Sequence, residues 1–230
     1  MMFRKIESTM LKIKPLVLAG AIVLPLHDVN RWQLLEYSNL PANQVEFSDR
    51  GMLVSVKQSA SPIVYPLDGI SRVTRVSVSG ELIGLLDIDP GRQGQKGKDD
   101  FSLRVGLVIA GDRRLSFFQR LVSADWVKTL YGLAPADAGI DRILFLNAVQ
   151  DDSQLGLRRQ HPLSDLIYER NVWLLDRSGP FELHYDLESP QDVVAVWISI
   201  DGDDSHSSYS TLISNLSLEG SIADSRSAPD

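Results

Sequence analysis

The sequence contains no cysteine among its 230 residues. This absence excludes disulfide bonds, thiolate nucleophiles and cysteine-type zinc sites together. The formal net charge is −7, and no run of Lys and Arg with interleaved aromatic residues occurs. Nucleic acid is therefore not expected as a partner, because phosphate contacts need clustered basic side chains. With 43% hydrophobic and 23% charged residues, the chain can still bury a substantial core.

Catalytic motifs are missing as well. The sequence has no GxSxG elbow and no GxxxxGK[ST] phosphate loop, and its four histidines show neither HxH nor HExxH spacing. A carboxylate pair could support glycoside hydrolysis, but no spacing joins any two of the candidates, Asp87, Asp89, Glu169 and Glu182. The sequence leaves catalysis open while leaning against an enzyme, and it indicates no catalytic residue.

An uncharged run from Pro15 to Leu26 follows a basic segment that contains Lys12 and Lys14. The run is too short to cross a bilayer as a helix, and a basic segment before a short apolar one is typical of a secretory signal. We expect residues 1–26 to be a signal peptide or leader. The protein would then be exported, periplasmic or secreted, with the leader cleaved or kept as an anchor. The alternative is a buried first strand from Ala21 to Leu26.

Most of the remaining chain has the two-residue rhythm of β-strands, separated by turn-forming pairs such as Asp68-Gly69 and Ser178-Gly179. We predict a mostly all-β protein, an antiparallel β-sandwich or jelly roll over residues 27–220, followed by a disordered tail at 221–230. The predicted strands are 51–57, 71–79, 81–88, 104–110, 142–149, 172–175, 181–187, 193–200 and 209–218.

The strand predicted at 193–200 is apolar on both faces, which indicates a central position in a covered sheet. One face would carry Val194, Val196, Ile198 and Ile200, and the other Val193, Ala195 and Trp197.

One segment departs from the strand pattern. Apolar residues recur at steps of three and four between 115 and 131, which predicts one covering α-helix from Leu115 to Tyr131, with Gly132 after it as a C-terminal stop. We expect its aromatic residues to pack in the core rather than to form a ligand platform. The apolar positions are Phe117, Phe118, Leu121, Val122, Trp126, Val127 and Leu130.

The loop after the strand at 193–200 carries Asp201, Asp203 and Asp204, with several serines. Three carboxylates this close repel one another unless a cation, a basic partner or solvent neutralises them. Calcium takes oxygen ligands of these types, so Asp201 and Asp203 are candidate calcium ligands. The loop is not an EF-hand, because Leu212 stands where the closing Glu is needed. A solvated loop is the favoured alternative.

A second acidic group, Asp99 and Asp100, precedes Arg104. Asp100 and Arg104 are four residues apart, which in a strand places both on one face, so an ion pair between them is the expected structural role. The functional alternative is a polar binding cluster that includes Asp99 beside the Gly-rich turn at 90–97.

Three short motifs resemble a family of exported bacterial proteins known as domain of unknown function 3047, over residues 73–218. They are the segment from Lys98 to Arg104, the helix end Leu130-Tyr131-Gly132, and the C-terminal group Asp201, Asp203, Asp204 and Ser205. The family resembles galactose-binding jelly rolls, which implies export and a sugar- or surface-binding module. The chain departs from the family's pattern in the middle strands, where it lacks a tryptophan that the family tends to carry.

These observations favour a noncatalytic exported module that binds a carbohydrate or a cell-envelope component. The candidate ligand-binding residues are Asp99, Asp100, Arg104, Asp201, Asp203 and Asp204. Two alternatives stay open: a glycosidase-like enzyme that uses an Asp/Glu pair, and a structural envelope protein with a calcium-stabilised loop. The sequence does not indicate an oligomeric state.

Overall fold

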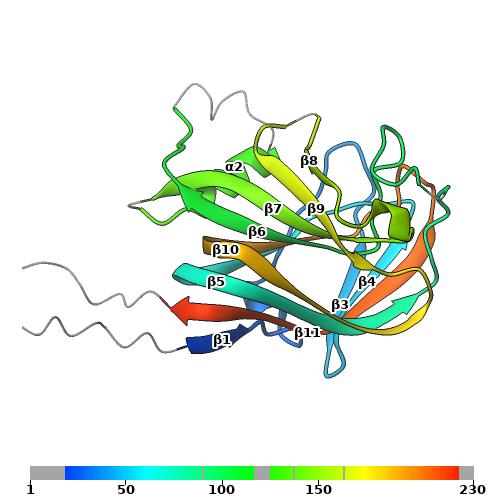
Figure 1. Ribbon diagram of the computed structural model, residues 1–230, viewed down its shortest axis with the longest axis horizontal. Helices are drawn as coiled ribbons and strands as arrows, with labels where there is room; N and C mark the ends of the chain where they lie inside the picture. Colours follow the sequence, from blue (N-terminus) through cyan, green and yellow to red (C-terminus); the bar gives the residue numbers. More distant parts are fainter. Residues whose placement is uncertain (1–18, 90, 117–124, 137, 163, 223–230) are drawn as a thin grey trace, which may run out of the picture.

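The computed structural model describes residues 19–222, except 90, 117–124, 137 and 163 (Figure 1). The described residues contain one α-helix, α2 (Asp125–Gly132), and are otherwise mostly strands. The strands are β1 (Ala19–Val23), β2 (Gln33–Leu34), β3 (Gln44–Ser48), β4 (Gly51–Lys57), β5 (Ile63–Ile83), β6 (Arg104–Gly111), β7 (Gly139–Val149), β8 (Arg158–Gln160), β9 (Ile167–Leu174), β10 (Gly179–Ser199) and β11 (Ser208–Ile222). The predicted fold class, a mostly all-β sandwich with one helix, is confirmed.

All the strands belong to one hydrogen-bonded sheet of order β3-β4-β11-β5-β10-β6-β7-β9-β8, with β1 added beside β11 and β2 beside β5. Neighbours are antiparallel except β7 and β9, which run parallel. The expectation of a purely antiparallel sheet is therefore wrong at this one pair. The connection from β7 to β9 passes through the short strand β8, which pairs with the outer edge of β9.

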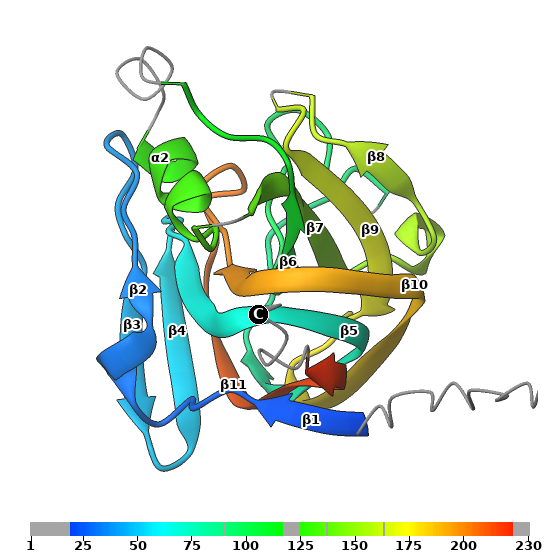
Figure 2. The ribbon, with the colours of Figure 1, turned by 90° about the vertical axis from the view of Figure 1, so that its left-hand side faces the viewer.

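The sheet folds over itself because β5 and β10, of 21 residues each, take part in both layers (Figure 2). The first half of β10 pairs only with β5, whereas its second half pairs with both β5 and β6. The register of β10 with β5 breaks between these halves, at Asp186/Gln191, and again near the start of the second half, at Val193/Ala195. Such bulges bend a strand and increase its twist, which lets one strand pass from layer to layer.

Two hydrophobic clusters form the core. The larger one lies between the layers and joins residues such as Leu107 and Leu146 to Val54 and Ile213. The second lies on the outer face of the β6-β7 layer, where Phe145 and Trp197 belong to it. Helix α2 covers part of this outer face with Leu130 (Figure 1).

Several predicted strands are longer or merged in the structure. The segments predicted at 71–79 and 81–88 form one strand that ends at Ile83, and those at 181–187 and 193–200 are both parts of β10. The central position of β10 agrees with its two apolar faces. However, the bulge places Val193 in the larger cluster and Val194 in the second, the reverse of strict alternation.

The helix is shorter at its start than predicted. Residues 115 and 116 are not helical, and positions 117–124 lie outside the described residues, with Phe117, Phe118, Leu121 and Val122 among them. The described helix runs from Asp125 to Gly132, one residue beyond the predicted end at Tyr131.

The predicted leader overlaps the folded domain. Strand β1 pairs with the C-terminal strand β11, and Leu24 and Leu26 are 2% and 3% exposed. The alternative of a buried first strand from Ala21 to Leu26 is met in part, because the strand runs from Ala19 to Val23, Val23 is 64% exposed, and the buried Leu24 and Leu26 follow the strand. Export and cleavage stay predictions.

Gly106 on β6 provides a test of the packing on the outer face. A Cβ there would lie 2.7 Å from Phe145 Cε1, 2.8 Å from Ile143 Cγ2 and 2.9 Å from the Trp197 carbonyl oxygen. We expect Gly106→Ala to lower the free energy of unfolding by about 1–3 kcal/mol, because overpacking forces neighbours to move. Urea unfolding measures this change. Gly20→Ala, which meets no atom within 4 Å, is the control, and equal effects of the two substitutions would contradict the prediction.

Candidate ligand-binding site

Strand register places polar and aromatic side chains together on the outer face. Gly106 on β6 lies between Trp197 on β10 and Phe145 on β7, and Arg104 lies one step further along, opposite Ser199. Since alternate residues of a strand face the same side, Arg104 shares this face with the aromatic residues. The face therefore changes from apolar to charged at the end where β6 begins.

Arg104 is the centre of the charged part. Its guanidinium lies 3.1 Å from Asp99 Oδ1, 3.6 Å from Glu169 Oε1 and 3.6 Å from Asp201 Oδ2. It also lies 4.1 Å from the centroid of the Phe101 ring. Only 8% of the Arg104 side chain is exposed, and burial alone would lower its pKa. The surrounding carboxylates compensate the buried charge and raise the pKa above its ordinary value.

Asp99 joins three cationic or hydrogen-bonding partners. Its carboxylate accepts hydrogen bonds from Arg104 and Arg159, and its Oδ2 lies 3.0 Å from Nε2 of His161. Burial alone would raise the pKa of Asp99, but the His161 hydrogen bond and the two arginine charges outweigh burial and lower the pKa to about 2. Asp99 is therefore an anion at any physiological pH.

Asp100 has a different role from the one that the sequence predicts. Within the described part of the chain, Asp100 forms no ion pair with Arg104. Its neighbour Asp99 forms that ion pair instead. Asp100 is 1% exposed and accepts backbone N–H groups of Ser205, at 2.6 Å, and Asp204, at 3.4 Å. In return, Asp204 accepts the Asp99 backbone N–H at 3.1 Å. These bonds fasten the two acidic segments to each other.

Asp201 is the most perturbed carboxyl group of the site. The Ser199 hydroxyl lies 2.8 Å from its Oδ1, and the Tyr209 hydroxyl donates to its backbone carbonyl at 2.8 Å. Burial raises the pKa of Asp201 to about 7, although Arg104 and the Ser199 hydrogen bond act in the opposite direction. Burial and the nearby Asp100 also raise the pKa of Asp203.

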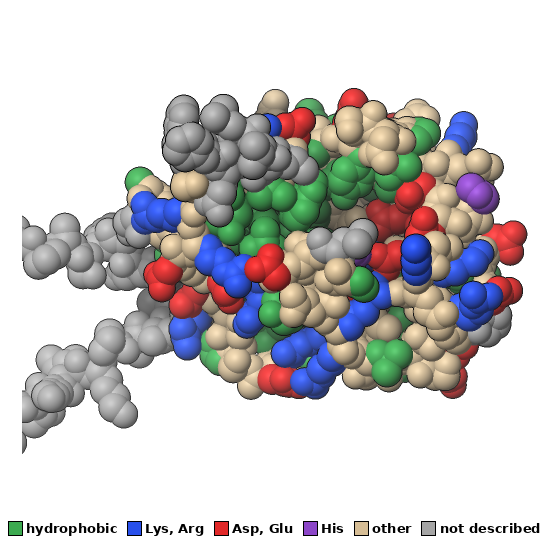
Figure 3. Space-filling model, turned by 90° about the horizontal axis from the view of Figure 1, so that it is seen from above, with side chains coloured by type: hydrophobic (Ala, Val, Ile, Leu, Met, Phe, Trp, Pro, Cys, Tyr) green, Lys and Arg blue, Asp and Glu red, His purple; other side chains and the backbone are tan. Residues whose placement is uncertain are grey.

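A cavity of about 350 Å³ lies over these groups. From above, a hollowed area of hydrophobic side chains adjoins a group of acidic side chains (Figure 3). The cavity thus has an aromatic wall and a charged end. Its lining comprises Tyr37, Leu40, Ala60, Asp99, Asp100, Arg104, Trp126, Ile143, Phe145, His161, Ser164, Ile167, Trp197, Ser199, Asp201, Asp203 and Asp204.

The structure brings all six candidate residues of the sequence analysis to this one cavity, although they come from segments about a hundred positions apart. Trp126 packs against the second cluster and also lines the cavity, so the expectation of a purely core role is incomplete. Sequence reasoning missed Arg159, His161 and Glu169 as members of the network. The sequence signal for Arg159 and His161 is the polarity of the segment from Arg158 to His161, whereas Glu169 stands out in the sequence only as one carboxylate candidate without a partner.

Calcium gains no support from the geometry. Among the described residues, no group of three or more His, Cys, Asp or Glu side chains is arranged to hold a metal ion. Both carboxylate oxygens of Asp201 already accept from Ser199, and Oδ2 also faces Arg104. The positive charge of Arg104, 3.6 Å from Asp201 Oδ2, would also repel a metal ion at this carboxyl group.

No protein-family model matches the chain, and no curated protein matches its sequence. The resemblance to domain of unknown function 3047 therefore stays a prediction. Within the part of the chain that the structure describes, no helix has both the length and the apolar character that crossing a membrane requires.

Removing the central cation tests the network. Arg104→Met would leave Asp99, Glu169 and Asp201 without their shared partner, and we expect a loss of about 3–5 kcal/mol in the free energy of unfolding. Urea unfolding measures it. The control is Arg50→Met, which breaks an exposed pair with Glu81 and should cost less than about 1 kcal/mol. Similar losses for both variants would refute a central role for Arg104.

The raised pKa of Asp201 predicts that the stability of the protein depends on pH. The ordinary pKa of an aspartate carboxyl group is 3.8 and that of Asp201 in the folded protein is about 7, so between these values the folded state binds more protons than the unfolded state. The contribution of Asp201 to the free energy of unfolding is fully present below pH 3.8 and is lost as the pH rises to about 7. Relative to Asp201→Asn, the wild type should lose stability with a slope approaching about 1.4 kcal/mol per pH unit.

Urea unfolding of both proteins at several pH values measures this difference. Asp49→Asn, in the exposed turn between β3 and β4, is the matched control for the loss of a carboxylate and should change the free energy of unfolding by less than about 0.5 kcal/mol at neutral pH. A wild-type minus Asp201→Asn difference that stays constant from pH 4 to pH 7 would contradict the raised pKa.

Proposed function

We propose that the protein is a noncatalytic, exported module that binds a carbohydrate or another polyhydroxylated component of the cell envelope. The observation that carries this proposal is the cavity in which Trp126, Phe145 and Trp197 adjoin a cluster of fixed charges. Small-molecule sites combine apolar and aromatic walls with a few placed polar groups, in volumes of about 300–1,000 Å³. The volume of about 350 Å³ falls in this range.

Sugars match the two sides of this cavity. Their C–H faces pack against aromatic rings, and their hydroxyl groups donate to carboxylates and accept from guanidinium groups. Hydrogen bonds with charged partners are about twice as strong as neutral ones, and the site offers Asp203 and Asp204 as acceptors. The acidic residues outnumber the basic ones, which disfavours strongly anionic glycans.

One observation favours an alternative, a carbohydrate-active enzyme. Two carboxyl groups of the same cavity have pKa values moved in opposite directions, to about 2 for Asp99 and about 7 for Asp201. Pairs of this kind supply the base or nucleophile and the general acid of glycosidases. In that case Asp201 would be the acid and Asp99 the base or nucleophile.

Binding is tested with the full chain on arrays of neutral hexose and N-acetylhexosamine glycans, followed by calorimetric titration of the strongest one. We expect Trp126→Ala to weaken binding at least about 10-fold, because aromatic residues that fill pocket walls contribute most of the binding free energy. Asp203→Asn should also weaken it, since it removes a charged acceptor from the half-buried end of the cavity.

Two matched controls accompany these variants. Tyr168→Ala removes an aromatic ring that does not line this cavity, and Asp49→Asn removes an exposed carboxylate from a turn. Both should bind like wild type. Absence of binding on every array would contradict the proposal. Turnover of a glycan that is lost in both Asp99→Asn and Asp201→Asn would instead favour the enzyme.

A further inference from the structure

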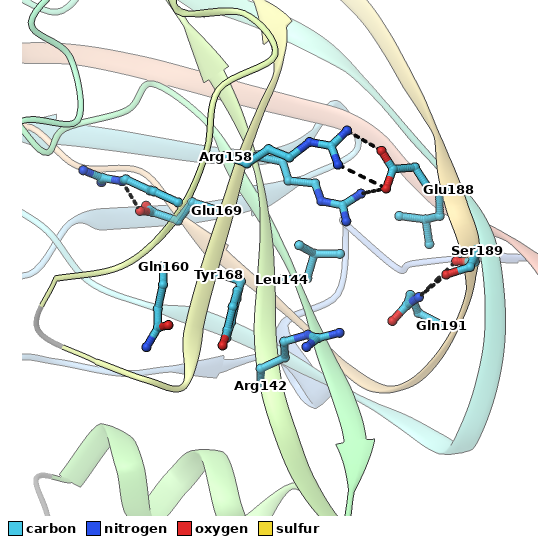
Figure 4. Close-up of a pocket in the computed structure, with 12 residues that line it drawn as sticks. Arg142, Leu144, Arg158, Gln160, Tyr168, Glu169, Glu188, Ser189 and Gln191 are labelled. Atoms are coloured by element: carbon cyan, nitrogen blue, oxygen red, sulfur yellow. Dashed lines mark hydrogen bonds and ion pairs between the residues drawn. The ribbon is translucent and has the colours of Figure 1, made fainter.

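A second cavity, of about 410 Å³, lies on the other side of the β7-β9 strands (Figure 4). Arg142 on β7, Arg158 on β8 and Arg170 on β9 line it from one side. The segment of β10 that contains Glu188 lines it from the opposite side, where the register with β5 is broken between Asp186 and Gln191. Several β10 residues therefore leave the β5 ladder at this point and form a wall of the cavity.

The charge of this cavity is opposite to that of the whole chain. Four arginines line it, against two glutamates, while the protein has a net charge of −7. One of the glutamates, Glu169, is buried and is paired with Arg159 and Arg104. The exposed part of the cavity therefore holds Arg142, Arg158 and Arg170 with one carboxylate, Glu188.

Glu188 shows how the arginines arrange around an oxyanion. Its carboxylate is bound by both nitrogens of the Arg158 fork and lies 3.3 Å from Arg170 (Figure 4). The third arginine, Arg142, stacks on Tyr168 at 5.1 Å, and among the described residues its ion-pair partner is its half-exposed neighbour in sequence, Asp141, at 3.4 Å. The guanidinium groups of Arg158 and Arg170 thus converge on the Glu188 carboxylate, and the guanidinium group of Arg142 lines the same cavity.

We propose that this cavity is a second binding site, for a phosphate or sulfate group carried on a small polar molecule. Arginine forks match the geometry of such oxyanions and bind them bidentately. The oxyanion would bind Arg142 and displace Glu188 from Arg158 and Arg170. Ser189, Gln160 and Gln191 supply further polar groups for the carrier, for which a volume of about 410 Å³ leaves room. This site is independent of the function proposed above.

Calorimetric titration of the full chain at low ionic strength tests the site, with inorganic phosphate, sulfate and a hexose 6-phosphate as probes. We expect Arg142→Gln and Arg170→Gln each to weaken binding by about 10-fold or more. Glu188→Gln should strengthen binding several-fold, because it releases two guanidinium groups from their carboxylate. Tighter binding of the hexose 6-phosphate than of phosphate would show that the carrier also occupies the cavity.

Arg50→Gln is the matched control, because it removes one charge from an exposed ion pair with Glu81 and lines neither cavity. It should bind like wild type. The proposal is overturned if none of the three probes binds, if Arg50→Gln weakens binding as much as Arg142→Gln, or if Glu188→Gln weakens it. The opposite effects of removing an arginine and removing the glutamate also exclude misfolding as the cause.

Discussion

The buried charge of Arg104 is the constraint on which the site depends. A guanidinium group placed in a sheet between two apolar clusters is unstable unless carboxylates compensate it. The three that do so, from Asp99, Glu169 and Asp201, come from segments far apart in the sequence. Folding must therefore bring the loop before β6, the strand β9 and the loop after β10 to one point. The hydrogen bonds of Asp100 and Asp204 then hold the two loops together.

The same network connects the two cavities. Arg159 and Glu169 line the basic cavity, and they bind Asp99 and Arg104, which line the acidic one. A single layer of strands thus separates regions of opposite charge. Arg104 Nε and Glu169 Oε1 lack hydrogen-bond partners in the described part of the chain. Each of these atoms still faces an ion-pair partner at 3.6 Å, Glu169 Oε1 the Arg104 guanidinium and Arg104 Nε the Asp201 carboxyl group, so their charges are compensated.

Much of the fold follows from local patterns in the sequence, whereas the site follows from contacts between distant segments. Strand alternation predicts most of the sheet, but it fails at Val193 and Val194, where a bulge exchanges the two faces. Helical spacing predicts α2 but extends it to residues 115 and 116, where no helix forms. Spacing also pairs Arg104 with Asp100. The structure uses Asp99 for that role, since Asp100 binds backbone groups of a loop about a hundred residues away.

The occupancy of the carboxylates weighs against Asp99 and Asp201 as catalytic groups. A nucleophilic carboxylate needs an accessible lone pair, yet the Asp99 oxygens already accept from Arg104, Arg159 and His161. A pKa near 2 also marks a weak base. Asp201 is similarly engaged by Ser199, and its side chain is only 10% exposed. Groups held by so many protein partners are rigid. A rigid site loses less conformational entropy when a ligand binds.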